Sequence, residues 1–389
     1  DYTLSRGLGD VYKRQTGSLE ITGSYFPKSE GESFGTNITA EAKVVGYEDL
    51  SEIQLEYELI IRKSLNDGGM DIIEPRQLVL SKTFGEIDAY FGYRHTFWGV
   101  AESRNIVDLI NQQDMAAGIS PDNKLGAPSI SFETYLGSGD FQYWYMPRCR
   151  ERTFNEKDAH PGFGLPVFPA EFAHSKGVEA IDQALRYGNS SGDVDFAFSL
   201  FDGTAREPFI VVDSAEGGIV PFYERMRSVG LELQYTGESI LYKLEGLTGA
   251  QGDENFNAAV LGAERTVYSI LDTPWDMGLI VEYQYDDRVQ AQIERLFVSG
   301  VRLTSNDEFD TSLLILYTVD DDLSQSIFGL EASRRLRNGM TLGFNYLLYQ
   351  SDEQQLPLYS LIDDSELSLT LGYYLSLIHI SEPTRQRVI

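Results

Sequence analysis

The chain has 389 residues, and its 31 basic and 60 acidic side chains give a formal net charge of −29. This charge argues against nucleic acid as a partner, because binding to phosphates needs a basic surface. The single cysteine, Cys149, excludes an intramolecular disulfide framework and a cysteine-based zinc site. Because 42% of the residues are hydrophobic and 12% are aromatic, the chain has the composition of an ordered protein.

No run of about 18 apolar residues occurs, so no transmembrane helix is predicted. Both ends of the chain look foreign. The segments 9–15 and 376–386 resemble translated read-through of a sequencing adapter, and neither continues the pattern beside it. We therefore expect residues 1–15 and 376–389 to be non-native and residues 16–375 to form the domain.

Apolar and polar residues alternate through most of this domain. Between residues 53 and 61 the apolar set is Ile53, Leu55, Tyr57, Leu59 and Ile61, with Gln54, Glu56 and Glu58 between them. Such a period of two predicts a β-strand, because successive side chains leave opposite faces of a strand. In chain order the predicted strands are 18–25, 36–47, 52–63, 73–83, 86–94, 128–136, 140–147, 181–189, 193–202, 228–236, 239–249, 257–268, 275–285, 295–304, 308–319, 325–336, 340–349 and 366–375.

The connections between these strands differ in length by parity. The even ones are mostly tight turns of Gly, Ser, Asn and Asp, for example at 48–51, 85, 137–139, 190–192, 237–238, 305–307 and 337–339. The odd ones are longer, at 26–35, 64–72, 95–127, 148–180, 203–227, 250–256, 286–294 and 350–365. Short turns on one side and long loops on the other are typical of an outer-membrane barrel.

We therefore predict an all-β fold: a single closed antiparallel transmembrane β-barrel of about 18 strands (16–18), with long extracellular loops and short periplasmic turns. In such a barrel the apolar face of each strand contacts lipid and the polar face lines the lumen. The positions expected to face the lumen include Glu56, Glu58, Glu232, Gln234, Lys243, Glu245, Glu282 and Gln284. So many polar groups could not fill a dry core without a large desolvation cost.

Several fragments carry a family resemblance. The stretches 94–103 and 106–114, with 150–154, 206–208, 221–223, 331–336 and 357–361, resemble a poorly characterised family of proteobacterial outer-membrane β-barrel proteins. More distantly, the chain is similar to phosphate-selective and alginate-export porins. The strand 366–375 also resembles the C-terminal strand that the outer-membrane assembly machinery recognises. These likenesses imply an outer-membrane location and a porin-like role, without assigning any functional residue.

The loop 148–180 is the first candidate for a functional element, because a long aromatic loop in a barrel often folds inward and narrows the pore. Arginines at its root, with two from the preceding loop, are a hypothetical constriction of an anion pore: Arg94, Arg104, Arg148, Arg150 and Arg152. The alternative is a solvated loop whose arginines pair with carboxylates. The segment 105–111 is expected to form a short helix that plugs the lumen or caps the loop.

Catalysis is not expected. After the ends are removed only His95, His160 and His174 remain, and none lies in a recognisable nucleophile motif. Acidic loops such as 252–255 and 320–322 do not match a calcium-binding loop, so neither a metal nor a cofactor is predicted.

The sequence thus favours a porin-like channel for passive diffusion of small hydrophilic solutes or ions in the outer membrane of a Gram-negative bacterium. Its expected partners are membrane lipid and lipopolysaccharide, the assembly machinery and the solutes, with the oligomeric state open. A non-conducting binding or adhesion barrel is the alternative, followed by an outer-membrane enzyme. The negative charge favours cations and the arginines favour anions, so the ion preference stays open.

Overall fold

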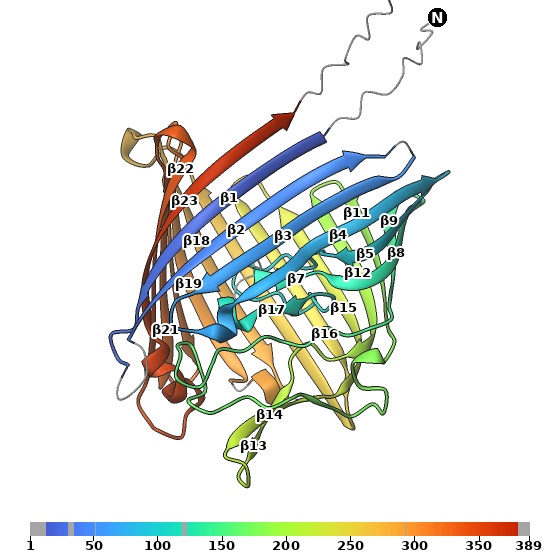
Figure 1. Ribbon diagram of the computed structural model, residues 1–389. Helices are drawn as coiled ribbons and strands as arrows, with labels where there is room; N and C mark the ends of the chain where they lie inside the picture. The colour runs from blue at the N-terminus through green and yellow to red at the C-terminus, as the bar shows by residue number, and fades with distance from the viewer. Residues whose placement is uncertain (1–12, 30–34, 51, 119–122, 292, 380–389) are drawn as a thin grey trace, which may run out of the picture.

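The predicted strands form one antiparallel sheet of eighteen strands, which closes into a barrel because β1 pairs with both β2 and β23. Figure 1 shows this barrel in a computed structural model, with the first and last strands side by side. The structure describes residues 13–29, 35–50, 52–118, 123–291 and 293–379. The prediction of a single closed antiparallel barrel of about 18 strands is confirmed.

The barrel strands follow the chain order, each paired with its sequence neighbours in the barrel. They are β1 (Lys13–Tyr25), β2 (Thr36–Asp49), β3 (Gln54–Ser64), β4 (Ile72–Phe84), β5 (Ile87–Arg94), β8 (Ala127–Leu136), β9 (Gly139–Met146), β11 (Asp182–Ser191), β12 (Val194–Thr204), β15 (Arg225–Thr236), β16 (Ile240–Gln251), β17 (Glu254–Val267), β18 (Trp275–Asp286), β19 (Arg295–Ser305), β20 (Ser312–Asp320), β21 (Gln325–Arg335), β22 (Met340–Ser351) and β23 (Glu366–His379).

Alternating side chains give this sheet two chemically different faces. Leu19 and Ile21 of β1 are 45% and 48% exposed. On the adjacent strand β23, Leu369 and Leu371 are 52% and 42% exposed. Thr22, which follows Ile21, points to the other face, where its hydroxyl lies 2.9 Å from that of its partner Thr370. The outer face is therefore apolar and the inner face polar, as the period of two predicts.

The long connections lie at one end of the barrel, together with the short turns Gly252–Asp253 and 321–324, and the connections at the other end are all short. Gly192 connects β11 to β12 with a φ of +62°, a conformation that a glycine adopts without strain. One predicted loop is wrong. Within residues 250–256 only Gly252–Asp253 form a turn, because the strands β16 and β17 continue up to these two residues. The strand predicted at 308–319 begins only at Ser312, since the residues before it form a turn in which Ser305 N–H donates to Thr311 O at 2.8 Å.

The connections carry short elements of their own. These are the strands β6 (Gln112–Gln113), β7 (Lys124–Leu125), β10 (Glu171–Phe172), β13 (Phe209–Asp213) and β14 (Gly218–Tyr223), and the 3-10 turns η1 (Gly68–Met70), η2 (Met115–Ala117), η4 (Gly177–Glu179), η5 (Ile270–Asp272), η6 (Val289–Ala291), η7 (Arg337–Gly339) and η8 (Pro357–Asp364). The hairpin of β13 and β14 extends beyond the barrel rim at the bottom of Figure 1. Across the described ranges, no helix is long and apolar enough to span a membrane.

The segments predicted to be foreign lie partly in the closing ladder. Residues 13–15 of β1 pair with residues 377–379 of β23, in register with the rest of the two strands. Residues 1–12 and 380–389 lie outside the described part of the chain. The prediction that residues 1–15 and 376–389 are non-native stays a prediction.

Candidate functional site: the interior of the barrel

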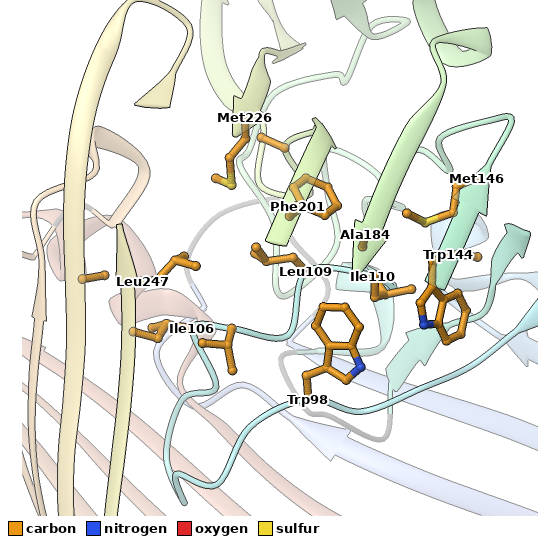
Figure 2. Close-up of a cluster of buried hydrophobic side chains, with 14 of the residues drawn as sticks. Trp98, Ile106, Leu109, Ile110, Trp144, Met146, Ala184, Phe201, Met226 and Leu247 are labelled. Atoms are coloured by element: carbon orange, nitrogen blue, oxygen red, sulfur yellow. The ribbon is translucent and has the colours of Figure 1, made fainter. Parts of the chain in front are cut away.

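The connection between β5 and β8, residues 95–126, folds back into the barrel (Figure 1). It carries Trp98, Val107 and Ile110, whose exposed fractions are 1%, 0% and 0%. These three residues belong to an apolar cluster with side chains of the barrel wall, which include Trp144, Met146, Ala184, Phe201, Met226 and Leu247. Figure 2 shows Trp98 and Ile110 among these wall residues. One side of the interior therefore contains a packed apolar cluster, which the polar pattern of the strands did not predict.

The predicted helix at 105–111 is wrong. This stretch is a turn, in which Asp108 N–H donates to Asn105 O at 3.4 Å. The Asn111 side chain accepts from Thr96 N–H at 2.8 Å and donates to Arg94 O at 3.1 Å. Side-chain hydrogen bonds of this kind compete with a helical backbone, so the segment follows the barrel wall instead.

Wall carboxylates hold the inward segment by its backbone. Glu245 Oε1 accepts from the N–H groups of Val100 and Ala101 at 2.7 and 2.8 Å. Glu282 Oε1 accepts from Glu102 N–H at 2.7 Å, and its Oε2 accepts from Ser103 N–H at 3.0 Å. We call residues 99–103 the gripped segment, because four of its N–H groups pair with these two carboxylates.

A third carboxylate completes the row. Glu232 Oε2 accepts from Gly99 N–H at 3.2 Å, while Arg186 donates to both of its oxygens at 2.9 and 2.8 Å. Because Glu232, Glu245 and Glu282 lie on β15, β16 and β18, the gripped segment spans four adjacent strands. Backbone N–H groups bonded to a carboxylate form strong hydrogen bonds, so this row fixes the depth of the loop.

The gripped segment also presents a charge of its own. Glu102 pairs with Arg302 and, at 3.6 Å, with Lys243, and both cations also pair with Glu264. Ser103 Oγ accepts from Gln284 Nε2 at 2.6 Å. Lys243 and Gln284, both expected to face the lumen, thus contact the loop that fills it.

The remaining positions expected to face the lumen lie in two places. On β3, Glu56 accepts from Gln77 Nε2 at 2.7 Å, and Glu58 lies 3.4 Å from Arg76. On β15, Gln234 is half-buried, two residues from Glu232 toward the short-turn end. The eight positions are therefore divided between the side of the barrel that the loop covers and the side of β3.

The five arginines proposed for a constriction do not form one ring. Arg94 contacts Glu133 at 2.6 Å and lies over the Tyr90 ring, 3.6 Å from its centroid. Arg150 contacts Glu74 at 2.6 Å and also donates to two backbone carbonyl groups. Arg148 is exposed where the chain leaves β9.

Arg104 and Arg152 belong to a separate cluster around Glu207. Arg104 lies 3.6 Å from this carboxylate and 3.0 Å from Asp286, and Arg288 lies 3.8 Å from Glu207 and 2.7 Å from Asp286. Burial opposes the charged form of Glu207, but Arg104, Arg288, Arg152 and Lys124 together lower its pKa to about 2. The cluster thus holds cations and carboxylates together and is not an open basic ring.

The second long connection, residues 147–181, packs against the first. Asp114, which belongs to the loop 95–126, pairs with Arg62 of β3 at 2.7 Å and accepts from the Thr153 hydroxyl. Arg206 of the third connection donates through Nε to Ile110 O at 3.0 Å. The long connections thus form one assembly, in which the loop 95–126 lies deepest and the loop expected to be inward, 148–180, supports it.

His160 joins three connections at the long-loop end of the barrel. Its Nδ1 lies 2.7 Å from Asp364 Oδ1 at the end of η8, and its Nε2 lies 3.0 Å from Ser29 Oγ in the connection after β1. The Phe26 ring packs against the imidazole, with the ring centroids 5.1 Å apart. The sequence did not predict this array, because its members are 131 and 204 residues apart.

The other histidines have ordinary partners. His95 lies 3.5 Å from Arg76 Nη2, and His174 Nδ1 accepts from Lys176 N–H at 3.2 Å. Within the described part of the chain, no group of three or more His, Cys, Asp or Glu side chains is arranged to hold a metal ion.

Neither protein-family models nor curated proteins match this sequence. Among solved structures, the chain is similar to OccD3 (OpdP) of Pseudomonas aeruginosa, with a TM-score of 0.52 and 9% identity over 94% of this chain and 91% of that chain. A mutant of the Rh. blastica porin aligns with a TM-score of 0.44 and 10% identity, over 94% of this chain and 100% of that chain. The likeness to OccD3 supports a distant, porin-like relationship at the level of the fold. The similarity to phosphate-selective and alginate-export porins and the closer family resemblance stay predictions.

Proposed function

We propose that this chain is a channel in the outer membrane of a Gram-negative bacterium, through which small hydrophilic solutes or ions diffuse passively. The observation that carries the proposal is the contrast between two sides of the inner wall. Under the gripped segment, Glu232, Glu245 and Glu282 are 3%, 0% and 4% exposed. On β1 and β23, by contrast, the inner side chains of Thr22 and Thr370 are only partly buried. Water-accessible polar groups on the uncovered wall support a path beside the loop.

The outer face supports the proposed location. Large apolar side chains at outward positions stay exposed around the barrel, for example Phe91 (62%), Phe198 (53%), Val281 (56%) and Phe297 (49%). A soluble protein rarely exposes so much contiguous apolar surface, whereas a bilayer would cover it. Membrane lipid and lipopolysaccharide are therefore the proposed surroundings, and the outer-membrane assembly machinery the proposed partner in insertion.

The test is single-channel recording of the 389-residue chain, refolded into a planar bilayer and verified as folded by its shift on unheated gels. We expect stable current steps that are smaller than those of an empty barrel of this strand number, because the loop occupies part of the lumen. A protein that folds and inserts but passes no current would refute the channel and favour a binding or adhesion barrel.

A second candidate function, ester hydrolysis, is favoured by the array of Ser29, His160 and Asp364. A hydroxyl on one imidazole nitrogen and a carboxylate on the other is the arrangement of a Ser–His–Asp triad. The side chains of His160 and Asp364 are 9% and 3% exposed, whereas Ser29 is half-buried and within reach of a solute. In this reading Ser29 Oγ bonds to the ester carbonyl carbon as the alcohol leaves. His160 Nε2 carries the serine proton to that alcohol, and water then releases the acid.

A serine-directed fluorophosphonate tests this second function without a known substrate. If the array is catalytic, mass spectrometry will locate the label on Ser29, and the Asp364→Asn variant will label about 10³–10⁴ times more slowly. Ser24→Ala, on the inner face of β1, is the matched control and should label normally, whereas Ser29→Ala should not. A folded chain that stays unlabelled at Ser29 would leave the array a structural link between loops.

A further inference from the structure

Three of the five arginines predicted to form an anion site are compensated by carboxylates. Arg94, Arg104 and Arg150 each have an acidic partner at 2.6 to 3.0 Å, in Glu133, Asp286 and Glu74. An anion entering the lumen would have to compete with these bound carboxylates for each guanidinium group. These three arginines therefore contribute little net positive potential to the lumen.

The other cations of the inner wall are compensated in the same way. Arg186 contacts Glu232 at 2.8 Å and Arg302 contacts Glu264 at 3.0 Å. Other close pairs are Lys43 with Glu41 at 3.4 Å, Arg62 with Glu41 at 3.3 Å, Arg76 with Glu58 at 3.4 Å, and Lys243 with Glu264 at 3.6 Å. Each of these pairs is close to neutral for an ion that passes more than a few ångströms away.

Three inner carboxylates differ, because no neighbouring cation compensates their negative charge. Glu20 accepts from the Tyr374 hydroxyl at 3.4 Å, and Glu56 accepts from the Gln77 amide at 2.7 Å. Glu366 shares the inner face of β23 with Ser368 and Thr370. Among the described side chains, none of the three has an ion pair with Lys, Arg or His. All three side chains are partly exposed, so they are open to water.

These carboxylates lie on the wall that the gripped segment leaves uncovered. They belong to β23, β1 and β3, which follow one another around the barrel with only β2 between the last two (Figure 1). Glu366 begins β23 just after a long connection, Glu20 lies in the middle of β1, and Glu56 lies near the start of β3 just after a short turn. Negative charge is therefore distributed along the whole proposed path, from one end of the barrel to the other.

We propose that the channel prefers cations and that Glu20, Glu56 and Glu366 determine this preference. The inference rests on the proposed channel function. Fixed carboxylates along a wet lumen attract small cations and repel anions. Salt screens charges over about 8 Å at 0.15 M ionic strength, so the preference is largest in dilute salt and falls as salt is added.

The test is the reversal potential of the full chain across a tenfold gradient of potassium chloride, with Glu20→Gln, Glu56→Gln and Glu366→Gln combined in one variant. A matched control combines Glu238→Gln, Asp253→Asn and Glu308→Gln, which change the formal charge equally at exposed turns. We expect a cation-selective wild type. In the lumen variant the potassium-to-chloride permeability ratio should fall by a factor of about two or more. This is the effect that one unit charge has on a permeating ion at a distance of roughly 8 Å in water. The control should keep the wild-type ratio.

Each result decides a different question. A conducting wild type that is anion-selective or unselective would overturn the cation preference while leaving the channel intact. A lumen variant that conducts with an unchanged potassium-to-chloride permeability ratio would also overturn the cation preference. Absence of current from folded, inserted wild type would refute the proposed channel itself and, with it, the preference. Because the glutamines keep the size and the hydrogen-bonding capacity of the glutamates, loss of folding is not expected.

Discussion

Arg206 and Asp182 form a buried ion pair, in which Nη1 and Oδ2 are 2.8 Å apart and the carboxylate is 0% exposed. The same carboxylate pairs with Arg225 at 2.6 Å and accepts from Thr204 N–H at 2.8 Å. Because Arg206 also donates to the backbone of the inward segment, the pair joins the wall of β11 to the loop inside the barrel.

We expect Asp182→Asn to destabilise the protein strongly, because it removes the charge that compensates a buried guanidinium group. Breaking a buried pair from one side costs about 3–5 kcal/mol. Asp310→Asn is the control, since its ion pair with Arg335 is exposed and worth roughly 0–1 kcal/mol. Urea unfolding in lipid vesicles measures both, and equal losses for the two variants would contradict the role assigned to Asp182.

Glu245→Ala should loosen the inward loop while the barrel persists. Three backbone N–H groups, those of Val100, Ala101 and Val107, lose their acceptor, and each hydrogen bond to a charged group contributes about 1.5–3 kcal/mol. We expect larger and noisier single-channel currents than in the wild type. Glu238→Ala, in an exposed turn, is the control, and a current indistinguishable from it would mean that the carboxylate does not hold the loop.

Glu207 should contribute an acid-dependent stability. Its folded pKa of about 2 lies below the ordinary value of 4.5, so its contribution is fully present above about pH 4.5 and is lost as the pH falls toward 2. Glu207→Gln should flatten the dependence of stability on pH within this window. Thermal unfolding between pH 5 and pH 2.5 measures the effect, and an unchanged pH profile in the variant would disprove it.

Cys149 should resist alkylation in the folded protein. Its side chain is 2% exposed, and burial raises the pKa of the thiol to about 11. At pH 8 almost no reactive thiolate is then present or accessible, so maleimide labelling should require unfolding. Urea-unfolded protein is the positive control. Rapid labelling of folded protein would show that the connections around Cys149 open in solution.

The strands were predictable from the sequence because a barrel wall imposes a local rule. Each residue contacts either the apolar outside or the polar inside, so the alternation around Leu55, Tyr57 and Leu59 follows from the wall alone. Errors occurred where a connection had to be judged, as at the turn Gly252–Asp253. There the strands simply continue, and composition alone resembles that of an acidic loop.

The interior was not predictable in the same way, because its contacts join distant parts of the chain. Glu282 and Ser103 are 179 residues apart, and nothing local marks one as the acceptor of the other. A signal was present at Gly99, whose φ is +130° and where a Cβ atom would lie 2.7 Å from Glu245 Oε1. Only the structure shows that this glycine allows the loop to approach the wall.

The ladder between β1 and β23 has a consequence for the order of folding. It pairs Tyr25 with Leu367 and Gly17 with Leu375, so it closes a loop that contains almost the entire chain. Contacts of such high sequence separation form slowly, because closing a long loop costs entropy before any contact repays it. Until β1 pairs with β23, the sheet has two open edges that can pair with another molecule. Assembly should therefore be slow and prone to aggregation at high protein concentration. The pairing of β1 with β23 should be its last step.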